Sequence, residues 1–430
     1  MRIWLINIGE EIPSDPGTPR LLRTGILAGL LAQRGNEVVW WNATFNHQRK
    51  EQRATVSEFR DTPEGYRLAL LAGRAYGRNI SLTRVLSQIE NAREFKRLAP
   101  GLPRPDAIVC GYPTIELAEA AVGYANARGV PIAVDFRDLW PDVIAEQIPG
   151  PLRLAAQPML AHWRRTLARI VRGATGVIGV TDGFVDWALA AGRRARGPRD
   201  RAFHLAINPE LPSPAAIREA EVYWDALGIG TDPAVTVACF IGTLSRRLDI
   251  GTLLAGALRL SPDEKRRFKL VICGKGDLDH ELRAAASGEP SVVFPGWRNA
   301  AEIHALLRRC DVGTLPYQST LDFVRHYPNK VGEYLGAGLP IMTPLKGQVR
   351  TLIDGRGVGY LYDERDPESA AACLRRVIAG AADRAQMRAR ALTAHSELFD
   401  SARIYREFGD YVEALAAGGC TSRTAHEAEA

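Results

Sequence analysis

Cysteine is scarce in this sequence, and the few cysteines present are scattered along it. No two cysteines are separated by just two residues, so neither a CxxC metal site nor a CxxC redox motif is predicted. Two of them, Cys239 and Cys273, lie inside apolar runs typical of buried strands. We therefore expect reduced core residues of a cytosolic protein and no disulfide framework. The six are Cys110, Cys239, Cys273, Cys310, Cys373 and Cys420.

Long apolar runs are also missing. No run reaches the roughly 18 residues of a transmembrane segment, so no membrane-spanning helix is expected. The first apolar run, residues 1–9, is broken too early for a secretory signal peptide. No GxGxxG pattern follows any predicted strand, which argues against a dinucleotide-dependent dehydrogenase. Nucleic-acid binding is not expected either, because no aromatic-rich strand motif accompanies the basic charge.

The composition is that of a globular protein, with 46% hydrophobic and 24% charged residues. A chain of 430 residues exceeds one ordinary hydrophobic core, so two large domains are expected. The net charge of +6 permits phosphorylated substrates, anionic membranes or nucleic acid as partners. Charge alone does not choose among these three.

Strand and helix patterns alternate along most of the chain. A strand at residues 1–9, a helix at 20–34 and a strand at 37–41 form a β–α–β unit. Such a unit begins a doubly wound parallel sheet, whose ligands bind at the carboxyl ends of the strands. The same alternation starts again near residue 235. We predict an α/β fold with domains at 1–212 and 213–397, a last helix at 398–417 and a disordered tail at 418–430.

A basic segment between residues 64 and 104 interrupts this alternation. It carries eight Lys or Arg and three Glu, with apolar residues between them. A basic amphipathic segment of this kind can lie on an anionic membrane surface. The alternative is a helical excursion with a solvated basic face.

The stretch 326–340 combines a turn, a short helix and two charged residues. Pro328 suits a helix start, and Pro340 follows the helix end. Lys330 and Glu333 are three residues apart and share one face. A helix N-terminus suits a phosphate, Lys330 adds a cation there, and Glu333 can accept from a sugar hydroxyl. The alternative is an ordinary amphipathic helix with a surface Lys–Glu pair.

Several short motifs occur in a fixed order, and their order and spacing are specific although each is weak alone. They are Phe240–Leu244, Ile272–Gly276, Val293–Gly296, Cys310–Val312 with Leu315–Pro316, and Pro328–Lys330 with Glu333–Tyr334 and Gly338–Pro340. With these motifs the chain resembles the retaining GT-B glycosyltransferases of family 4. Asp135–Pro141, of the form Asp-x-Arg-Asp-x-Trp-Pro, resembles a run of that family's bacterial surface-polysaccharide branch.

The resemblance implies two Rossmann-like, doubly wound parallel-sheet domains that face each other across a cleft. Residues 1–212 would be the acceptor domain and 213–397 the donor domain, with the helix 398–417 returning to the N-terminal domain. A nucleoside-diphosphate sugar is implied as co-substrate, without a further cofactor. No DxD motif stands out, and GT-B enzymes usually manage without a bound metal, so no metal site is expected.

The resemblance assigns the donor phosphates and ribose to four regions of the second domain. Glu333 matches the second Glu of the family's Glu-x7-Glu motif, which accepts from the ribose, whereas Arg325 replaces the first Glu. Lys330 and the backbone N–H groups of Thr320, Leu321 and Asp322 are expected to serve instead. Thr243 replaces the family's phosphate-binding Arg after Gly242. Arg246 and Arg247 are therefore the expected cations, Arg246 acting catalytically on the leaving diphosphate.

The remaining assignments concern the nucleotide base and the acceptor. Gly274, Gly276 and Trp297 are expected to face the base, because a glycine lets the backbone approach a ligand. In the first domain, Arg137 and Asp138 stand where the family commonly has a His. Asp138 is expected to position the acceptor or take a proton, and Arg137 to contact the donor sugar or a phosphate. Gly9, Arg20 and His47 are expected on the acceptor side, with a purely structural role as the alternative for His47.

These features predict a glycosyltransferase that moves a sugar to a glycan or polyprenyl-diphosphate-linked acceptor in cell-envelope polysaccharide synthesis. It would work in the cytoplasm, at the inner face of the plasma membrane. The missing His is tolerable, because the nucleotide phosphate can itself deprotonate the acceptor in the retaining chemistry. Thr243 and Arg325 motivate an alternative, a catalytically silent nucleotide-sugar-binding partner of another transferase. A sugar-nucleotide 2-epimerase is less favoured, because its His and carboxylates are not found at their usual places.

Overall fold

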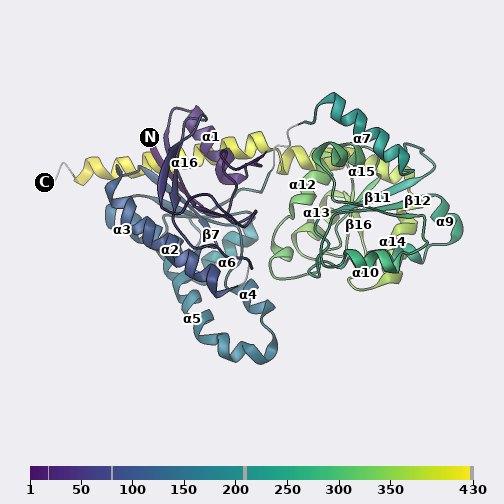
Figure 1. Cartoon of the computed structure of the whole chain (residues 1–430), viewed down its shortest axis with the longest axis horizontal. Coiled ribbons are helices and arrows are strands. Elements are labelled where there is room, and N and C mark those ends of the chain that lie inside the picture. The colour runs from purple at the N-terminus through teal and green to yellow at the C-terminus, as the bar shows by residue number, and fades with distance from the viewer. Residues whose placement is uncertain (18, 79–80, 207–210, 427–430) are drawn as a thin grey trace. The chain divides into compact units, whose positions relative to one another are not determined.

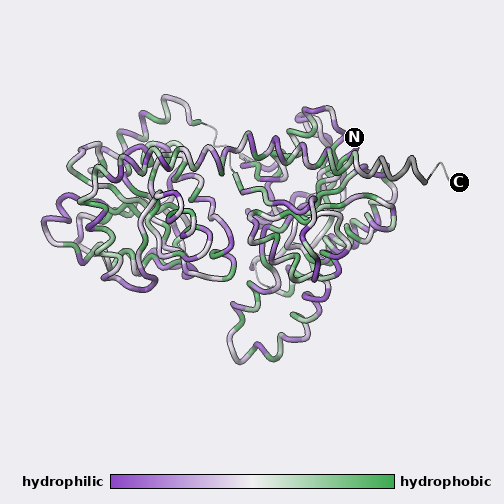
Figure 2. Tube along the Cα trace, turned by 180° about the vertical axis from the view of Figure 1, so that it is seen from behind, coloured by the Kyte–Doolittle hydropathy of each residue, from purple (hydrophilic) through white to green (hydrophobic). Residues whose placement is uncertain are grey.

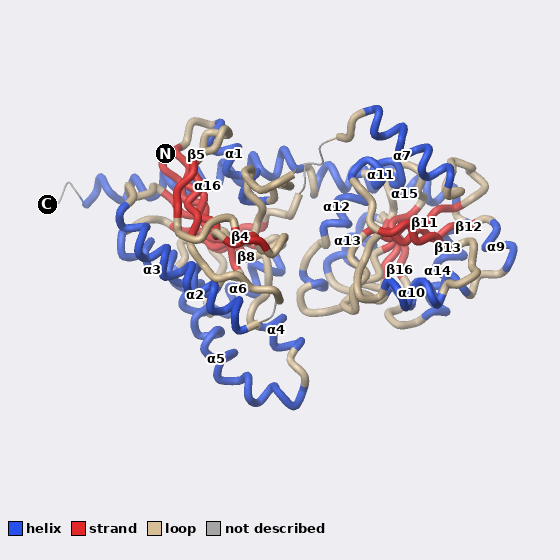
Figure 3. The backbone as a smooth tube through the Cα atoms, in the orientation of Figure 1, coloured by secondary structure: helices blue, strands red, loops and turns tan. Residues whose placement is uncertain are grey.

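The chain forms two α/β units, each with its own sheet and its own helices (Figures 1 and 3). The computed structural model describes residues 1–17, 19–78, 81–206 and 211–426. The first unit comprises Met1–Ile207 and Ser401–Ala430, and the second comprises Asn208–Asp400. The predicted α/β class with two parallel sheets is confirmed.

The sheet of the first unit has eight strands in the order β10-β9-β8-β7-β1-β2-β6-β5. Neighbouring strands are parallel, except that β5 is antiparallel to β6. The central strands are buried along their whole length and are largely apolar (Figure 2). The strands are β1 (Arg2–Ile6), β2 (Glu37–Ala43), β5 (Glu58–Asp61), β6 (Arg67–Leu71), β7 (Ala107–Tyr112), β8 (Ile132–Phe136), β9 (Gly176–Gly179) and β10 (Arg201–Ala202), and a separate hairpin pairs β3 (Phe45–Asn46) with β4 (Glu51–Gln52).

The C-terminal helix α16 (Ser401–His426) packs on α1 (Arg23–Gln33) of the first unit (Figure 1). Arg34 pairs with Asp410 at 2.7 Å and with Glu413 at 3.0 Å. The predicted return of this helix to the N-terminal domain is confirmed. α16 continues past residue 417, and residues 427–430 of the expected tail lie outside the described residues. The other helices of this unit are α2 (Leu82–Leu98), η1 (Ala99–Gly101), α3 (Ile115–Arg128), α4 (Asp142–Gln147), α5 (Gly150–Gly173) and α6 (Asp182–Gly192).

The basic segment 64–104 is not one amphipathic stretch, and that prediction is wrong. Its first part is the sheet strand β6, and its second part is the helix α2. Leu68, Leu70, Leu71 and Phe95 are buried in the core, whereas Leu82 and Leu86 are exposed. Its ion pairs are Arg67–Asp61, Arg74–Glu90 and Arg97–Glu94. A continuous lipid-facing apolar side is absent from the described part of the segment, because the core of the first unit buries four of these six apolar side chains.

The sheet of the second unit has six parallel strands in the order β13-β12-β11-β14-β15-β16. The strands are β11 (Thr236–Ile241), β12 (Phe268–Cys273), β13 (Val292–Gly296), β14 (Val312–Thr314), β15 (Ile341–Thr343) and β16 (Gly359–Leu361). The helices are α7 (Pro214–Ala226), α8 (Ile250–Leu258), α9 (Pro262–Arg266), α10 (Asp279–Ala285), α11 (Ala300–Leu307), η2 (Phe323–Arg325), α12 (Asn329–Gly336), α13 (Gln348–Arg356), α14 (Pro367–Ala379) and α15 (Ala381–Leu398). Among the described residues, no helix is long and apolar enough to cross a membrane.

Asp135 near the end of β8 is a fully buried carboxylate shared by two arginines. Its Oδ2 accepts from Nε of Arg23 at 2.9 Å and from Nε of Arg137 at 2.7 Å. Arg23 also donates to the carbonyl of Phe203 at 2.6 Å and lies over the ring of Phe408 in α16. Burial acts to raise the pKa of the Asp135 carboxyl, but the two guanidinium charges outweigh it and lower that pKa. This one group therefore ties β8, α1 and α16 together.

Replacing Asp135 by Ala should destabilise the first unit by about 3 kcal/mol or more, because two buried arginines lose their shared anion. The measurement is hydrogen–deuterium exchange of the β7–β9 peptides across a urea series. Because the folded-state pKa of Asp135 is lowered, its contribution should be complete above the ordinary Asp pKa and lost as the pH falls further. As a matched control, Asp61→Ala removes an exposed partner of Arg67 and should leave the midpoint nearly unchanged. Equal midpoints for the two variants would contradict the role given to Asp135.

Candidate functional site

The turns after β11, β12 and β13 meet at one edge of the second sheet. Parallel strands place their carboxyl ends together, and backbone hydrogen bonds link these turns directly. The N–H of Gly242 donates to the carbonyl of Cys273 at 3.0 Å, and that of Gly274 donates to the carbonyl of Gly296 at 2.9 Å. The structure thus brings five predicted donor residues to one edge. They are Gly242, Thr243, Gly274, Gly276 and Trp297.

This edge is built by close backbone approach. A Cβ at Gly274 would lie 1.8 Å from the carbonyl oxygen of Gly242, and one at Gly276 would lie 2.3 Å from that of Leu244. Gly274 also has φ of +147°, which L side chains rarely adopt. Beyond Gly296, the side chain of Trp297 is 65% exposed. The edge therefore presents glycine backbone without side chains next to the exposed ring of Trp297.

Helix α12 brings Lys330 and Glu333 to the same edge. Its Tyr334 is fully buried, and the Tyr334 hydroxyl accepts from the N–H of Ile241, the last residue of β11, at 3.2 Å. Lys330 and Glu333 are not among the buried residues of this helix, which are Val331, Tyr334 and Leu335. Lys330 Nζ lies 2.5 Å from Glu333 Oε2, and both side chains are about three-quarters covered. The predicted pairing of the two residues on one face is therefore present in the structure.

The two candidate phosphate-binding arginines have different surroundings. Arg247 pairs with Asp322 at 2.7 Å and lies 4.9 Å over the ring of Phe323, both on the segment between β14 and α12. Arg246 pairs at 3.3 Å with Glu281 of α10, and both of these side chains are exposed. Burial acts to raise the pKa of Asp322, but hydrogen bonds from Thr320 and Arg247 lower it, so the carboxylate stays ionised. Of the two cations, Arg247 has the more fixed position.

The segment before α12 is held by its own hydrogen bonds. The N–H of Thr320 donates to the carbonyl of Gln318 at 2.8 Å, and the hydroxyl of Thr320 donates to Asp322 at 2.6 Å. The carbonyl of Leu321 accepts from Nη1 of Arg325 at 3.0 Å. Thr320 therefore uses its N–H locally in this structure, and Arg325 supports the turn.

In the first unit, the loop after β1 lies against the β3–β4 hairpin. The carbonyl of Gly9 accepts from Nε2 of Gln48, the neighbour of His47, at 3.3 Å. The N–H of Arg20 donates to Glu11 at 3.1 Å, and Glu11 pairs with Arg49 of the hairpin at 2.9 Å. The structure therefore brings the three predicted acceptor-side residues into adjoining loops.

Arg137 and Asp138 are neighbours in sequence with separate surroundings. The Arg137 guanidinium contacts Asp135 and Glu10, and its Nη2 donates to the Thr24 hydroxyl at 3.0 Å. Burial acts to lower the pKa of Arg137, but the two carboxylates outweigh it and raise that pKa. Asp138 accepts from the N–H of Leu139 at 2.7 Å, and its charge acts on Arg84 of α2. The Arg137 guanidinium is thus bound by Asp135 of β8 and by Glu10 of the loop after β1.

Around His47 the structure gathers side chains that no sequence motif indicated. Nδ1 of His47 lies 2.7 Å from the Tyr76 hydroxyl and 3.4 Å from Nζ of Lys50. The Arg84 guanidinium lies 6.0 Å from the Tyr76 ring centroid and 4.7 Å from that of Trp140. The members come from the hairpin, the loop after β6, α2 and the loop after β8. The apolar run of β6 is the one sequence signal for this cluster, because a strand there places Tyr76 in the loop at the sheet edge.

Burial and like charge govern the protonation of this cluster. Burial, then the charges of Arg84 and Lys50, lower the pKa of His47 to about 4. Burial and Arg84 lower the pKa of Lys50, and burial lowers that of Arg84. His47 is therefore neutral at pH 7, beside two cations.

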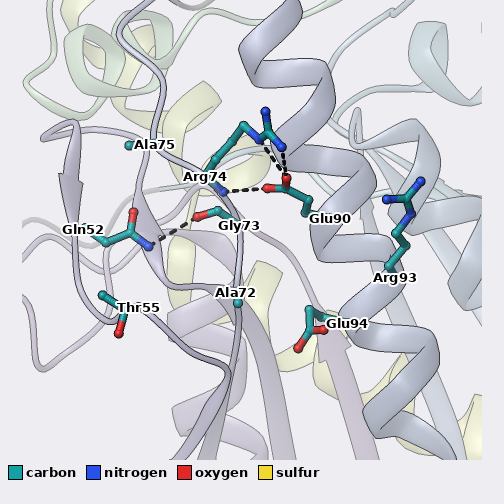
Figure 4. A pocket seen from close by; sticks show the side chains of 9 residues that line it. All are labelled: Gln52, Thr55, Ala72, Gly73, Arg74, Ala75, Glu90, Arg93 and Glu94. Carbon is teal, nitrogen blue, oxygen red and sulfur yellow. Dashed lines mark hydrogen bonds and ion pairs between the residues drawn. The ribbon is translucent and has the colours of Figure 1, made fainter.

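A pocket of about 460 Å³ lies elsewhere on the first unit, between α2 and the loop after β6 (Figure 4). Arg74 on its rim pairs with Glu90, and Gln52 donates to the carbonyl of Gly73 at 3.3 Å. None of the predicted site residues lines this pocket. Within the described ranges, no group of three His, Cys, Asp or Glu side chains is placed to hold a metal ion.

Known proteins share both the fold and part of the sequence. Residues 235–380 match the family model described as glycosyl transferases group 1. Over 180 residues the chain is 27% identical to amylovoran biosynthesis glycosyltransferase AmsK of Erwinia amylovora, covering 41% of this chain and 44% of AmsK. The match thus spans less than half the length of this curated relative.

Two solved structures match over nearly their whole length. Sucrose-phosphate synthase from Thermosynechococcus elongatus gives a TM-score of 0.70 at 16% identity, with 97% of this chain and 99% of that chain covered. Anabaena HepE in complex with UDP gives 0.65 at 15% identity, with 96% and 100% covered. At such identities the likeness shows the fold.

The two parallel-sheet units and the long C-terminal helix define the GT-B fold. Residues 235–380 match the group 1 glycosyltransferase model, so the resemblance to family 4 found in the motifs of the second half is confirmed.

The His47 imidazole should titrate near pH 4, well below an ordinary His, because burial and two nearby cations oppose its protonation. NMR of ring-labelled histidines across pH 3–8 measures this value. Lys50→Met should raise it by removing one cation. Folding stability linked to His47 should fall as the pH drops from about 6.5 toward 4, because the unfolded chain then binds a proton that the folded chain does not. Titration of His47 at its ordinary pKa would contradict the described burial.

Proposed function

We propose that this protein is a retaining glycosyltransferase that moves a sugar from a nucleoside-diphosphate sugar to a glycan or lipid-linked acceptor in cell-envelope polysaccharide synthesis. The observation that carries the proposal is the Lys330–Glu333 pair, held by Tyr334 at the carboxyl edge of a group 1 domain. The polysaccharide pathway is supported by the name of AmsK. A uridine donor is the first choice, because HepE was solved with UDP-glucose.

In the proposed donor complex, Glu333 accepts from a ribose hydroxyl, and Lys330 turns from Glu333 toward the diphosphate. Arg247, and Arg246 from the exposed side, offset the negative charge that the leaving diphosphate gains in the transition state. Gly242 and Thr243 contribute backbone next to the phosphates, with Thr320 and Leu321 on the opposite turn. Gly274, Gly276 and Trp297 receive the base, since backbone without side chains permits close approach.

In the proposed acceptor complex, the leaving phosphate takes the proton of the acceptor hydroxyl, so a strong protein base is not needed. Asp138 positions the acceptor from the edge of the first sheet. Arg137 acts as a positioning residue, because its guanidinium is engaged by Asp135, Glu10 and Thr24. Gly9, Arg20 and His47 line the acceptor side from adjoining loops.

A catalytically silent nucleotide-sugar-binding protein is the second candidate. It is favoured by Arg325, which holds the carbonyl of Leu321 where the family has an acid, and by Thr243 in place of an arginine. Such a protein would bind the donor without hydrolysing or transferring its sugar. Turnover of a bound donor separates the two candidates.

A panel of nucleoside-diphosphate sugars should contain a donor that raises the melting temperature. At a hundredfold excess over its Kd, that donor should raise the free energy of unfolding by roughly 2.7 kcal/mol. Glu333→Ala should weaken binding of that donor roughly tenfold or more, because a hydrogen bond to a charged group is lost. Calorimetric titration of the donor into each variant measures the change. Glu397→Ala, which removes an exposed acid of the same unit, is the matched control. Unchanged affinity in Glu333→Ala would rule out the ribose contact.

We further propose that α5 carries the protein to an anionic membrane surface. This helix extends from the body of the first unit (Figure 1), and Leu152, Leu154 and Met159 near its start are 59%, 83% and 38% exposed. Residues 150–173 contain five Arg and no Asp or Glu. An apolar tip on a cationic helix complements acidic lipid headgroups, which supports a lipid surface over an uncharged partner.

Changing Leu152 and Leu154 to Ser should reduce binding to phosphatidylglycerol-containing vesicles more than tenfold, because two exposed leucines lose their lipid contact. Co-sedimentation with vesicles of 30% phosphatidylglycerol in phosphatidylcholine measures the loss. The matched control is the Leu82→Ser and Leu86→Ser pair, which removes the exposed leucines of the basic segment 64–104. A greater loss in that control would assign membrane contact to α2, and vesicle binding unaffected by both pairs would overturn the proposal.

A further inference from the structure

The cluster around His47 and Tyr76 contains two cations, Lys50 and Arg84. Lys50 and Arg84 both lie near the Tyr76 ring, at 4.9 Å and 6.0 Å from its centroid. His47 is in contact with Tyr76 and Lys50, and Asp138 is the carboxylate whose charge acts on Arg84. With His47 neutral, these groups together carry a net charge of about +1 at pH 7. The molecule therefore holds two like charges close together at a ligand-binding edge.

The positions of the two cations are fixed by different elements. Arg84 projects from the first turn of α2 and lies over the ring of Trp140, 4.7 Å from its centroid. Lys50 stands in the β3–β4 hairpin, where Asn46 Oδ1 accepts from the N–H of Gln48 at 2.9 Å and of Arg49 at 3.0 Å. These hydrogen bonds fix the turn of the hairpin that carries Lys50. Preorganised cations lose little freedom on binding an anion.

Like charges held together destabilise each other, and an anion between them removes that repulsion. A phosphate group adds charge-assisted hydrogen bonds, which are shorter and stronger than neutral ones. The neutral imidazole of His47 and the hydroxyl of Tyr76 can each donate to, or accept from, a partly protonated phosphate. The ring of Phe45 lies 4.6 Å from that of Tyr76 and closes the apolar side. The cluster is chemically suited to a phosphate that is joined to a carbon group.

We propose that Lys50 and Arg84, with His47 and Tyr76, bind the phosphate or diphosphate of the acceptor substrate. The proposal rests on the function proposed above and narrows its acceptor to a phosphorylated one. The shared chemistry is a phosphate ester, whose source is either a lipid diphosphate or a free sugar phosphate. The carboxyl edge of the first sheet is the natural place, since β2, β6 and β8 all end there.

The experiment titrates inorganic pyrophosphate into the full chain by calorimetry. Lys50→Met and Arg84→Gln should each weaken its affinity roughly tenfold or more, because each removes one charge-assisted contact. Lys50→Arg, which keeps the charge, should restore most of it. Arg93→Gln is the matched control, because Arg93 lies on the same helix beside Glu90 and Glu94 (Figure 4) and should change the affinity less than twofold.

A second readout is the titration of His47, which bound pyrophosphate should shift to higher pH by neutralising the neighbouring cations. Pyrophosphate that does not bind, or that binds equally to wild type, Lys50→Met and Arg84→Gln, would overturn the proposal. An unshifted His47 titration in the presence of saturating pyrophosphate would place the bound anion elsewhere and overturn it as well.

Two further arms identify the source of the phosphate. Farnesyl diphosphate and glucose 1-phosphate are compared as probes, and tighter binding of the former supports a lipid acceptor. Nucleotide-sugar affinity is measured on the same variants and should stay unchanged. Loss of pyrophosphate binding without any sugar transfer would support the phosphate site while contradicting the enzyme function, whereas transfer with unaltered pyrophosphate binding would contradict only the phosphate site.

Discussion

The shared carboxylate of Asp135 is the interaction on which the ligand edge of the first unit depends. Its side chain is fully buried, and Arg23 and Arg137 stabilise its charge because both reach it. Arg137 in turn holds Glu10, whose carboxylate also accepts from the N–H and hydroxyl of Thr24. The loop after β1 and the start of α1 are thus fixed by one buried network. Loops that bind ligands are precise when such a network limits their freedom.

The second unit fixes its edge mainly through backbone contacts and one buried phenol. Its edge depends on backbone contacts, since Gly274 leaves room for the carbonyl of Gly242, and on one phenol, since Tyr334 joins α12 to β11. Lys330 and Glu333 then take their direction from the buried face of their helix. The edge of the second unit thus has open backbone, whereas the edge of the first unit presents side-chain charge. The two edges therefore suit two different ligands.

Much of the fold and part of the candidate site were predictable from local pattern. The apolar runs of the parallel strands and the motifs around Gly242, Gly274 and Lys330 carry their meaning within a few residues. The segment 64–104 was misjudged, because a short edge-side strand with basic flanks has the same composition as an amphipathic stretch. Without β6 as a strand, the loop that carries Tyr76 cannot be placed at the sheet edge. Its contacts with Lys50 and Arg84 therefore cannot be predicted from the sequence.

The sequence by itself determined the α/β class, the two units and the family 4 motifs, because strand periodicity and glycine turns depend on neighbours in the chain. Only the tertiary structure decided the roles of charged residues, because their partners lie far away in sequence. Asp135 meets Arg23 across 112 positions, which makes this carboxylate a structural anchor and engages the Arg137 guanidinium beside it. The distance between charges decides whether they bind a ligand or each other, and the folded chain alone sets that distance.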